Sequence, residues 1–393
     1  MIKEAVIIAG GRGERLLPIT KYLPKALTPI NGIPLIDLII NQLEGLNFSK
    51  VHVLAGYRGE LVEKYLLELK AFRQIEISVS ITDSELSSRE RVLTLESQIT
   101  GSLLLLYCDN YVESHSIVED FLNNGKDFGF IVEPRNEGNI KVDSHMRAFY
   151  NSKSRSSEFP FVELGYIKLD SSSFFNALHQ TESLQDALEL LTNTYEFTSI
   201  STNGTNISIS NLERFLALNQ NINIIMLDRD GILNKKMPKR KYLAKFSDYH
   251  PIKEIRAELK RLAAQGNYFV VITNQPGIAT SEVSERFLDE FHRTLVHELF
   301  LEGIFVLAIY HCPHHWDAGC KCRKPEPGML IDAMSDFHIN PRRTAFLGDD
   351  LRDQQAAQAA GVTGYVLSEE IKGQNYFLDI HAAVDAIIEQ LHH

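Results

Sequence analysis

Two short apolar runs, each rich in β-branched residues and each ending in a polar loop, constrain the fold of this chain more than any other feature. The first covers residues 5–9 and leads into the loop 10–13, which holds three glycines. The second covers residues 222–227 and leads into the loop 228–231, which holds two aspartates and a glycine. Such runs are typical of strands buried on both faces of a parallel sheet. Two such segments, each a strand-like run followed by a polar loop, predict two α/β domains in one chain.

Both halves alternate strand-like and helix-like segments, which is the pattern of doubly wound α/β domains. In the first half the expected strands are residues 50–55, 75–81, 103–107 and 128–132, and the expected helices are residues 35–46 and 59–70. In the second half the expected strands are residues 268–273, 305–310 and 344–347, and the expected helices are residues 252–265 and 281–301. A length of 393 residues also exceeds the usual size of a single core. We therefore predict one domain at residues 1–220 and a second at residues 221–393.

The composition excludes several classes of protein. With 40 Lys and Arg against 51 Asp and Glu, the net charge is -11, which disfavours a broad basic face for nucleic acid or anionic lipid. The apolar stretches are much shorter than the ~20 residues of a membrane-spanning helix, and the N-terminus lacks the pattern of a signal peptide. We expect a cytoplasmic protein that binds neither nucleic acid nor membrane. The sequence leaves open whether the chain forms a homo-oligomer.

The second half carries the most specific set of polar residues. Asp228 and Asp230 lie two positions apart on an extended backbone, so their side chains point the same way at the carboxyl end of a strand. Three further polar elements follow in order, which are Thr273-Asn274-Gln275, Arg323-Lys324-Pro325 and Gly348-Asp349-Asp350 with Asp353. Over residues 222–368 this order resembles the haloacid-dehalogenase phosphatase superfamily. Within it the chain is most similar to the group that contains D-glycero-D-manno-heptose 1,7-bisphosphate phosphatase and histidinol-phosphate phosphatase.

The resemblance implies a phosphatase that works through an aspartyl-phosphate. Asp228 is then the nucleophile, and Asp230 protonates the leaving group and later activates water. Mg2+ is expected at Asp228, at the backbone carbonyl of Asp230 and at Asp349, where it offsets the charge of the phosphate. The residues expected to hold the phosphate oxygens are Lys324, Thr273 and Asn274.

Three cysteines and a histidine are clustered just before Arg323 and Lys324. Three thiolates and one imidazole suit tetrahedral structural Zn2+, whereas four cysteines in the whole chain are too few for a disulfide framework at this length. We expect the zinc loop to hold Arg323 and Lys324 over the active site, with Arg323 contacting a small phosphorylated sugar. The stretch 232–272 is too short for a large cap domain. The four expected zinc ligands are Cys312, His314, Cys320 and Cys322.

The first half carries a glycine-rich loop followed by basic residues. The run from Ala9 to Thr20, together with Pro24-Lys25-Ala26-Leu27, resembles the sugar-phosphate nucleotidyltransferase family, and the similarity extends over residues 1–218. The resemblance implies a Rossmann-like domain in which glycines let the backbone approach a nucleoside triphosphate. It also implies that basic side chains neutralise the leaving pyrophosphate and that Asp109 binds Mg2+. The glycines are Gly10, Gly11 and Gly13, and the basic residues are Arg15 and Lys25.

Two parts of that family's pattern are missing. The second glycine-containing nucleotide loop, expected near residues 84–98, contains no glycine here. The late acidic motif aligns with residues 206–210, which places Asn206 where the family has an aspartate. An amide oxygen can bind Mg2+ but adds no negative charge. Two hypotheses follow for the first half, a working transferase and a module that binds a nucleotide or a sugar phosphate without turnover.

The two halves fit consecutive reactions, because a phosphatase that leaves a sugar 1-phosphate makes the substrate of a sugar-1-phosphate nucleotidyltransferase. We predict a bifunctional enzyme of nucleotide-activated heptose synthesis, with Mg2+ and Zn2+ as cofactors. It removes the C7 phosphate of heptose 1,7-bisphosphate and joins the remaining anomeric phosphate to a nucleotide, guanylyl if the product is the α-anomer. Histidinol phosphate is the alternative substrate for the phosphatase half.

Overall fold

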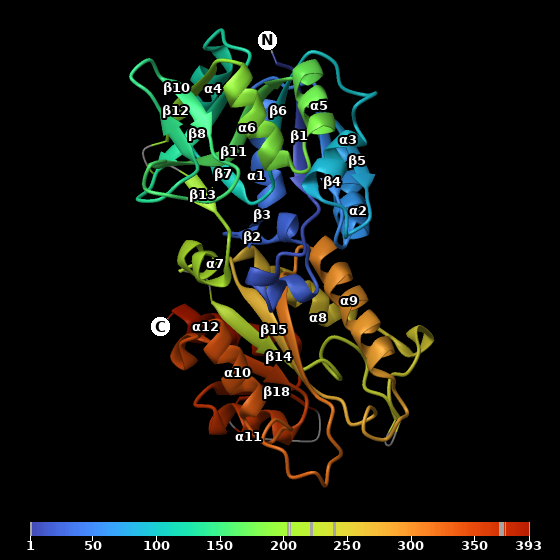
Figure 1. Cartoon of the computed structure of the whole chain (residues 1–393). Helices are drawn as coiled ribbons and strands as arrows, with labels where there is room; N and C mark the ends of the chain where they lie inside the picture. The colour runs from blue at the N-terminus through green and yellow to red at the C-terminus, as the bar shows by residue number, and fades with distance from the viewer. Residues whose placement is uncertain are drawn as a thin grey trace. The chain divides into compact units, whose positions relative to one another are not determined.

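The structure is a computed structural model, and it describes residues 2–202, 204, 206–220, 223–238, 241–368, 373 and 375–392. The chain divides into two compact units. Unit 1 comprises Met1–Leu16, Pro24–Thr28 and Ile33–Phe215, and unit 2 comprises Leu17–Leu23, Pro29–Gly32 and Leu216–His393. Each unit contains strands and helices in alternation (Figure 1), which confirms the predicted α/β class. The division at residue 220 stays a prediction.

Unit 1 contains a nine-stranded sheet with the order β5-β4-β1-β6-β11-β8-β12-β10-β9. The strands of this unit are β1 (Glu4–Ala9), β3 (Ile33–Pro34), β4 (Lys50–Ala55), β5 (Glu76–Ile81), β6 (Ser102–Tyr107), β7 (Asn110–Val112), β8 (Gly129–Pro134), β9 (Ile140–Val142), β10 (Arg147–Tyr150), β11 (Phe161–Asp170), β12 (Phe197–Ser201) and β13 (Asn206–Ser208). The helices are α1 (Leu35–Gly45), α2 (Gly59–Lys70), α3 (Ser88–Leu93), α4 (His115–Asn123), α5 (Ser171–Gln180) and α6 (Leu184–Thr194), and α7 (Leu212–Leu218) follows.

The expected segments of unit 1 are found close to their predicted positions, and β4 and α2 have the predicted bounds. Strands β5, β4, β1 and β6 are parallel neighbours, as a doubly wound domain requires. The rest of the sheet is mixed, because β11 runs antiparallel to both β6 and β8. Unit 1 is therefore a mixed α/β unit, and β1 lies inside its parallel part with the glycine-rich loop at its carboxyl end.

Unit 2 contains a six-stranded parallel sheet with the order β16-β15-β14-β17-β18-β19. Its strands are β2 (Pro29–Ile30), β14 (Ile224–Leu227), β15 (Tyr268–Asn274), β16 (Val306–Cys312), β17 (Ala345–Gly348), β18 (Thr363–Leu367) and β19 (Tyr376–Phe377). Its helices are α8 (Lys253–Ala264), α9 (Glu285–Leu301), α10 (Gly328–Asp336), α11 (Leu351–Ala359) and α12 (Ile380–His392). The winding reverses between β14 and β17, and ligands of such sheets bind at this switch point.

Most boundaries in unit 2 lie within one or two residues of the sequence prediction, and the start of α9 differs most. The strand expected from Ile222 is observed from Ile224, and Ile222 itself lies outside the described residues. Helix α9 begins at Glu285 rather than at residue 281, because Ser281 has a left-handed φ of 58° and the Ser284 hydroxyl caps the helix. Between Gly231 and β15 the described elements are a 3-10 turn (Phe246–Asp248) and α8, so the described residues contain no cap domain there.

Two short N-terminal segments are part of unit 2. The Tyr268 hydroxyl accepts a hydrogen bond from the Gly32 N–H at 3.0 Å and contacts the Asn219 side-chain oxygen at 3.0 Å. The His297 ring nitrogen Nε2 lies 3.0 Å from the carbonyl oxygen of Tyr22. The sequence next to the glycine-rich loop therefore contributes to the packing of unit 2, which sequence reasoning did not anticipate.

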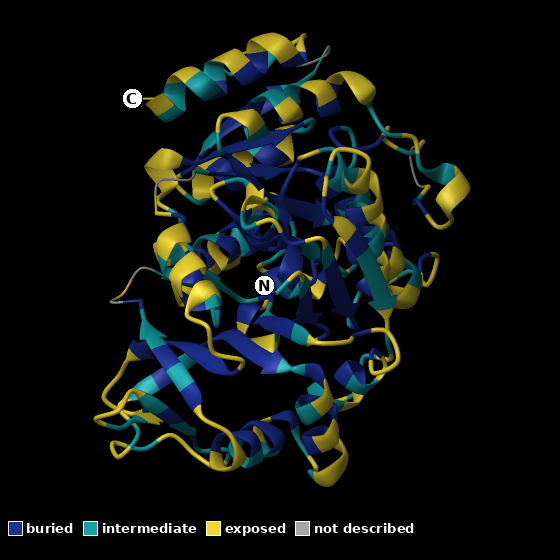
Figure 2. Cartoon of the chain, turned by 90° about the horizontal axis from the view of Figure 1, so that it is seen from above, coloured by how far each residue is buried: buried dark blue, intermediate teal, exposed yellow. Residues whose placement is uncertain are grey.

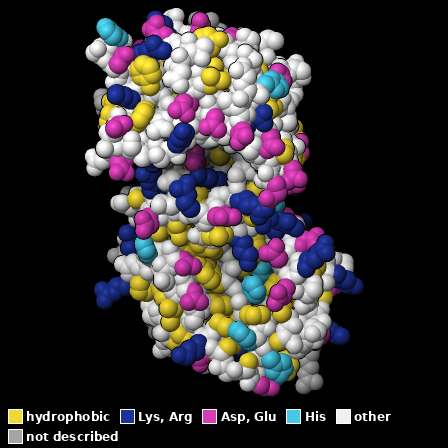
Figure 3. Space-filling view, in the orientation of Figure 1, with side chains coloured by type: hydrophobic (Ala, Val, Ile, Leu, Met, Phe, Trp, Pro, Cys, Tyr) yellow, Lys and Arg dark blue, Asp and Glu magenta, His cyan; other side chains and the backbone are white. Residues whose placement is uncertain are grey.

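Both sheets form buried layers (Figure 2), and residues of β1, β14 and β15 are almost fully buried. On the face in Figure 3, acidic and basic side chains are interspersed. The described helices include no segment that is both long and apolar enough to cross a membrane.

Candidate functional site

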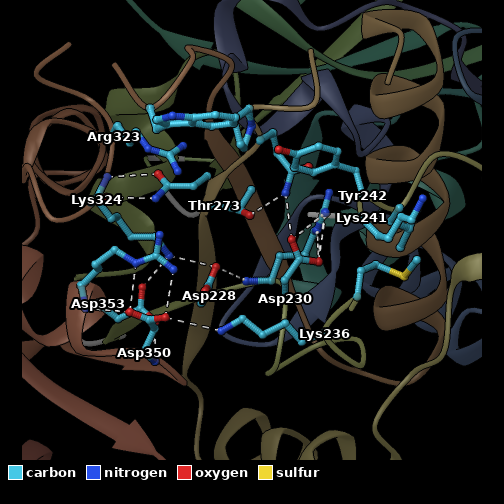
Figure 4. A pocket seen from close by; sticks show the side chains of 18 of the residues that line it. Asp228, Asp230, Lys236, Lys241, Tyr242, Thr273, Arg323, Lys324, Asp350 and Asp353 are labelled. Carbon is cyan, nitrogen blue, oxygen red and sulfur yellow. Dashed lines mark hydrogen bonds and ion pairs between the residues drawn. The ribbon is translucent and has the colours of Figure 1, made fainter. Parts of the chain in front are cut away.

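The carboxyl ends of three parallel strands position the predicted phosphatase residues of unit 2 (Figure 4). Asp228 directly follows β14, Thr273 lies near the end of β15, and Asp349 directly follows β17. Because β15, β14 and β17 are neighbours, their ends meet at one edge of the sheet. The ordered motifs of the sequence therefore converge at the switch point.

Lys324 is the buried cation of this site. Its side chain is 2% exposed, and its Nζ lies 2.9 Å from Asp228 Oδ1 and 2.7 Å from Asp353 Oδ1. The same Nζ donates to the carbonyl oxygen of Ile272 at 2.9 Å. The Asn274 amide group donates to the Lys324 carbonyl and accepts from the Lys324 N–H, both at 3.0 Å. Asn274 therefore positions Lys324 in this structure, and its contact with a phosphate stays a prediction.

Three carboxylates, of Asp228, Asp349 and Asp353, place oxygen atoms within 4.8 Å of one another. Burial raises the pKa of Asp228 to about 7, although the charge of Lys324 opposes the shift. Burial also raises the pKa of Asp349. Three carboxylates this close together repel one another, and a divalent cation would offset their charge. The donor set therefore fits Mg2+, which prefers carboxylate oxygens.

Gly231 keeps the space beside Asp349 open. Its φ is 97°, and a Cβ at this position would lie 2.1 Å from Asp349 Oδ2. Any other residue would therefore displace the carboxylate. Asp353 orients the same group, because its Oδ2 accepts hydrogen bonds from the Asp349 and Asp350 N–H groups at 3.1 Å. Asp228 and Asp349 come together as predicted, and Asp353 is an addition to the predicted set.

Asp230 is held as a hydrogen-bond acceptor. Arg229 donates to its carboxylate at 2.8 Å, Asn234 at 2.9 Å and Gln275 at 3.0 Å. Burial opposes ionisation, but the charge of Arg229 and these hydrogen bonds lower the pKa of Asp230. The carboxylate is thus held in its ionised form, and its predicted role as an acid requires that it gain a proton when substrate is bound. Its side chain is not a member of the three-carboxylate group.

Asp228, Asp230, Thr273, Lys324 and Asp353 line a pocket of about 550 Å³ (Figure 4). Lys236, Lys241, Tyr242 and Trp316 also line it. Arg323 lines the pocket as predicted, and its Nη1 atom is buried without a hydrogen-bond partner in the described part of the chain. A buried donor without a partner is costly, so the guanidinium suits an anionic ligand.

Sequence reasoning missed several of these residues. Arg229, Asn234 and Gln275 are sequence neighbours of predicted site residues, and that proximity was the available signal. Asp353 was part of a recognised motif, and its place one turn after Asp349 could have indicated a role. For Lys236, the only signal in the sequence was its positive charge.

The four expected zinc ligands lie together at the end of β16. Cys312 Sγ lies 3.6 Å from Cys320 Sγ, which lies 3.5 Å from Cys322 Sγ, and the His314 Nδ1 atom lies 3.2 Å from Cys322 Sγ. Zn–S bonds of about 2.3 Å in a tetrahedron separate the sulfur atoms by roughly 3.8 Å. The spacing therefore fits Zn2+. His315 lies outside the cluster and stacks on Trp316.

The candidate site of unit 1 is a second pocket, of about 450 Å³. It brings together Arg15, Lys25, Gly11, Gly13 and Ser210, as well as Arg12, Glu14 and Leu16. Gly10, the remaining predicted glycine, is not among its lining residues. A glycine-rich loop with both predicted basic side chains, Arg15 and Lys25, is suited to bind phosphate groups.

Arg91 occupies the space in front of Gly10. A Cβ on Gly10 would lie 2.5 Å from the Arg91 guanidinium, and a Cβ on Gly56 would lie 2.2 Å from it. Arg91 belongs to α3, which lies in the region where the family's second glycine loop was expected. The Ser87 side chain caps this helix. A capped helix with an inserted arginine therefore stands in place of the missing loop.

Asp109 and Asn206 are not partners in the strand register. Asp109 Oδ2 lies 2.6 Å from Lys25 Nζ. In the antiparallel pair β13 and β7, Asn206 is opposite Val112, and the Ile209 N–H donates to the Asp109 carbonyl. Asn206 therefore lies three positions along the strand from the residue that meets Asp109, and its alignment with a second metal ligand stays a prediction. Among the described residues, no group of three potential ligands includes Asp109.

Unit 1 also contains a buried carboxyl group at Glu163. Burial raises the pKa of Glu163 to about 7, although its Oε2 atom accepts a hydrogen bond from the Gly165 N–H at 2.8 Å. The charge of Asp109 raises this pKa further. Glu163 is therefore largely protonated below neutral pH in the folded protein.

Comparisons with known proteins find a different family in each half of the chain. The nucleotidyl transferase family matches residues 4–132, and the HAD-hydrolase-like family matches residues 321–393. D-glycero-alpha-D-manno-heptose-1,7-bisphosphate 7-phosphatase from Photorhabdus laumondii is 33% identical over 165 residues, which cover 38% of this chain and 87% of that protein. D-glycero-beta-D-manno-heptose-1,7-bisphosphate 7-phosphatase from Pasteurella multocida is 33% identical over 181 residues, which cover 42% of this chain and 97% of that protein. A solved UDP-glucose pyrophosphorylase in complex with UDP-glucose aligns with 56% of this chain and 97% of its own, at 17% identity and a TM-score of 0.48.

Proposed function

We infer the function of this enzyme from the family to which it belongs through its C-terminal half, that of D-glycero-D-manno-heptose-1,7-bisphosphate 7-phosphatase, and from its N-terminal nucleotidyl transferase domain. From this membership we propose that unit 2 removes the C7 phosphate of heptose 1,7-bisphosphate. We also propose that unit 1 transfers a nucleotidyl group to the resulting heptose 1-phosphate. The observation that carries the phosphatase proposal is the buried contact of Lys324 with Asp228 at the switch point of the sheet.

The proposed phosphatase reaction begins when an Asp228 carboxylate oxygen attacks the phosphorus atom of the phosphate on C7. The bond from phosphorus to the sugar oxygen breaks, and Asp230 gives a proton to that oxygen. Asp230 then takes a proton from a water molecule that attacks the aspartyl-phosphate, which releases phosphate and restores Asp228. Lys324, Thr273 and Arg323 stabilise the charge on the phosphate oxygens.

The same proposal assigns Mg2+ to Asp228, Asp349 and the backbone carbonyl of Asp230. When bound, the ion offsets the negative charge shared by the carboxylates and the phosphate. Zn2+ is proposed at the Cys312 cluster, where it fixes the loop that leads into Arg323 and Lys324.

In unit 1 the proposed transfer joins a sugar phosphate oxygen to the α-phosphorus of a nucleoside triphosphate, and pyrophosphate leaves. Arg15 and Lys25 are proposed to neutralise the leaving pyrophosphate, and Asp109 to hold Mg2+. A guanylyl group is proposed if the product is the α-anomer. The relatives' names include both anomers, so the anomer has to come from experiment.

The test uses the purified full chain with Mg2+, heptose 1,7-bisphosphate or histidinol phosphate, and each nucleoside triphosphate in turn. Phosphate and pyrophosphate are measured separately. We expect phosphate from the heptose substrate at a much higher kcat/KM than from histidinol phosphate, followed by pyrophosphate with one nucleotide. Phosphate release from histidinol phosphate alone would contradict the heptose assignment.

A second candidate function for unit 1 is binding without turnover. It is favoured by the Lys25 and Asp109 contact of 2.6 Å and by the position of Asn206 away from Asp109. Binding of nucleotides without pyrophosphate release, with every nucleotide and sugar 1-phosphate tried, would support this alternative over transfer.

A further inference from the structure

A second lysine in unit 2 covers the carboxylate assigned to the metal. Lys236 Nζ lies 2.9 Å from Asp349 Oδ2 and 3.1 Å from Asp349 Oδ1, so it contacts both oxygens. It also lies 3.6 Å from Asp350 Oδ2. The Asp349 side chain is 15% exposed, whereas that of Lys236 is 49% exposed. The ammonium therefore lies over Asp349 on its solvent side.

Lys324 and Lys236 differ in how firmly they are held. Lys324 is buried and fixed by three partners, which are Asp228, Asp353 and the Ile272 carbonyl. Lys236 lies in the loop after β14 and is half exposed. A metal ion at Asp349 needs oxygen atoms that Lys236 now contacts, and two cations at one carboxylate repel each other. Lys236 is therefore the cation that can leave.

Lys236 can also bind an anion inside the pocket. The described lining of the pocket includes six basic and four acidic side chains. Besides Lys236, three of the basic groups have acidic partners, since Arg229 pairs with Asp230, Arg352 with Asp350, and Lys324 with Asp228 and Asp353. A sugar bisphosphate brings a phosphate that does not react and still needs a cation. Lys236 is long enough to turn from Asp349 into the pocket that it lines.

We propose that Lys236 is a cation with two positions. Without metal it neutralises Asp349, and when Mg2+ binds it is displaced and binds the non-reacting phosphate of the substrate. Lys236 then couples metal binding to preference for a bisphosphate over a monophosphate. This inference rests on the proposed phosphatase function of unit 2.

The first test measures Mg2+ binding without substrate. Trp316, the only tryptophan in the sequence, lines the same pocket and serves as a fluorescent reporter, with calorimetry as a second measurement. Because a partly exposed ion pair is modest in strength, we expect Lys236→Gln to lower the Mg2+ Kd by about three- to tenfold. Lys236→Arg should keep a Kd close to that of the unmodified chain. The matched control is Lys245→Gln, which removes one charge outside the pocket and should leave the Kd unchanged.

The second test compares kcat/KM for heptose 1,7-bisphosphate with kcat/KM for heptose 7-phosphate. Lys236→Gln should reduce the ratio of the two values by about tenfold or more, because only the bisphosphate loses a contact. An unchanged Mg2+ Kd in Lys236→Gln would overturn the displacement, and an unchanged ratio would overturn the phosphate contact. If no variant and no unmodified chain binds Mg2+, the proposed function itself fails and this inference fails with it.

Discussion

The two candidate sites begin from the same pair, a lysine in contact with an aspartate, and differ in what surrounds it. In unit 2, Lys324 contacts Asp228 at 2.9 Å, and two further carboxylates lie within 4.8 Å of that aspartate. In unit 1, Lys25 contacts Asp109 at 2.6 Å, and no such carboxylate group is present among the residues the structure describes. The three carboxylates grouped in unit 2 fit a divalent cation, whereas in unit 1 Lys25 already pairs with Asp109. The comparison teaches that the charges around a matched aspartate, and not the motif alone, indicate how strongly a cation is needed there.

The substitution with the largest expected effect is Asp228→Asn, which should change the activity of unit 2 alone. Loss of the nucleophile should lower phosphatase kcat by roughly 10⁴-fold or more. Pyrophosphate release by unit 1, measured with added heptose 1-phosphate, should persist. Since the amide removes one charge from a crowded group, thermal unfolding should show no loss of stability. Loss of both activities in a folded protein would contradict the separation of roles.

Lys25→Ala tests the pair that Lys25 forms with Asp109 in unit 1. If unit 1 is a transferase, pyrophosphate release should fall by roughly 10²- to 10³-fold, because a charge that stabilises the leaving group is lost. Phosphate release from the bisphosphate should be unaffected. Unchanged pyrophosphate release would remove Lys25 from the transfer reaction.

Cys320→Ser tests whether the zinc loop supports Lys324. A serine oxygen is a poor replacement for a thiolate, so bound zinc, measured by elemental analysis, should fall below one ion per chain. Phosphatase kcat/KM should decrease by roughly 10- to 100-fold. Full zinc content with normal activity would contradict the assigned ligand set. Nucleotide binding by unit 1 serves as the internal control.

The smallest expected effect concerns Glu163 and pH. Its pKa of about 7 lies above the ordinary value of 4.5, so the protonated form is favoured by folding. Its contribution to stability is complete below about pH 4.5 and is lost as pH rises through 7. In the Glu163→Gln variant, the free energy of unfolding should therefore fall by about 1–3 kcal/mol less as the pH rises through 7. Equal slopes of unfolding free energy against pH for both proteins would show that Glu163 does not cause it.

Local sequence patterns predicted most of the elements that position the sites. Strand β4 and helix α2 have their predicted bounds because apolar periodicity is set by neighbouring residues. The start of α9 was misplaced because a left-handed Ser281 interrupts an otherwise helical pattern. The cluster of three cysteines and His314 could be predicted from spacing alone, since all four residues lie within eleven positions. The aspartates of unit 2 could be predicted because each follows a recognisable strand.

By itself the sequence determined that this chain has two α/β parts, which side chains follow the strands, and which four residues form the cysteine and histidine cluster. The tertiary structure alone decided that Lys236 contacts Asp349, 113 positions away, and that Asn206 lies opposite Val112 rather than at Asp109. The physical reason is that strand patterns depend on neighbouring residues, whereas strand register and charge pairing depend on packing between distant segments. A motif can therefore name the residues of a site, but only the fold determines which charges meet there.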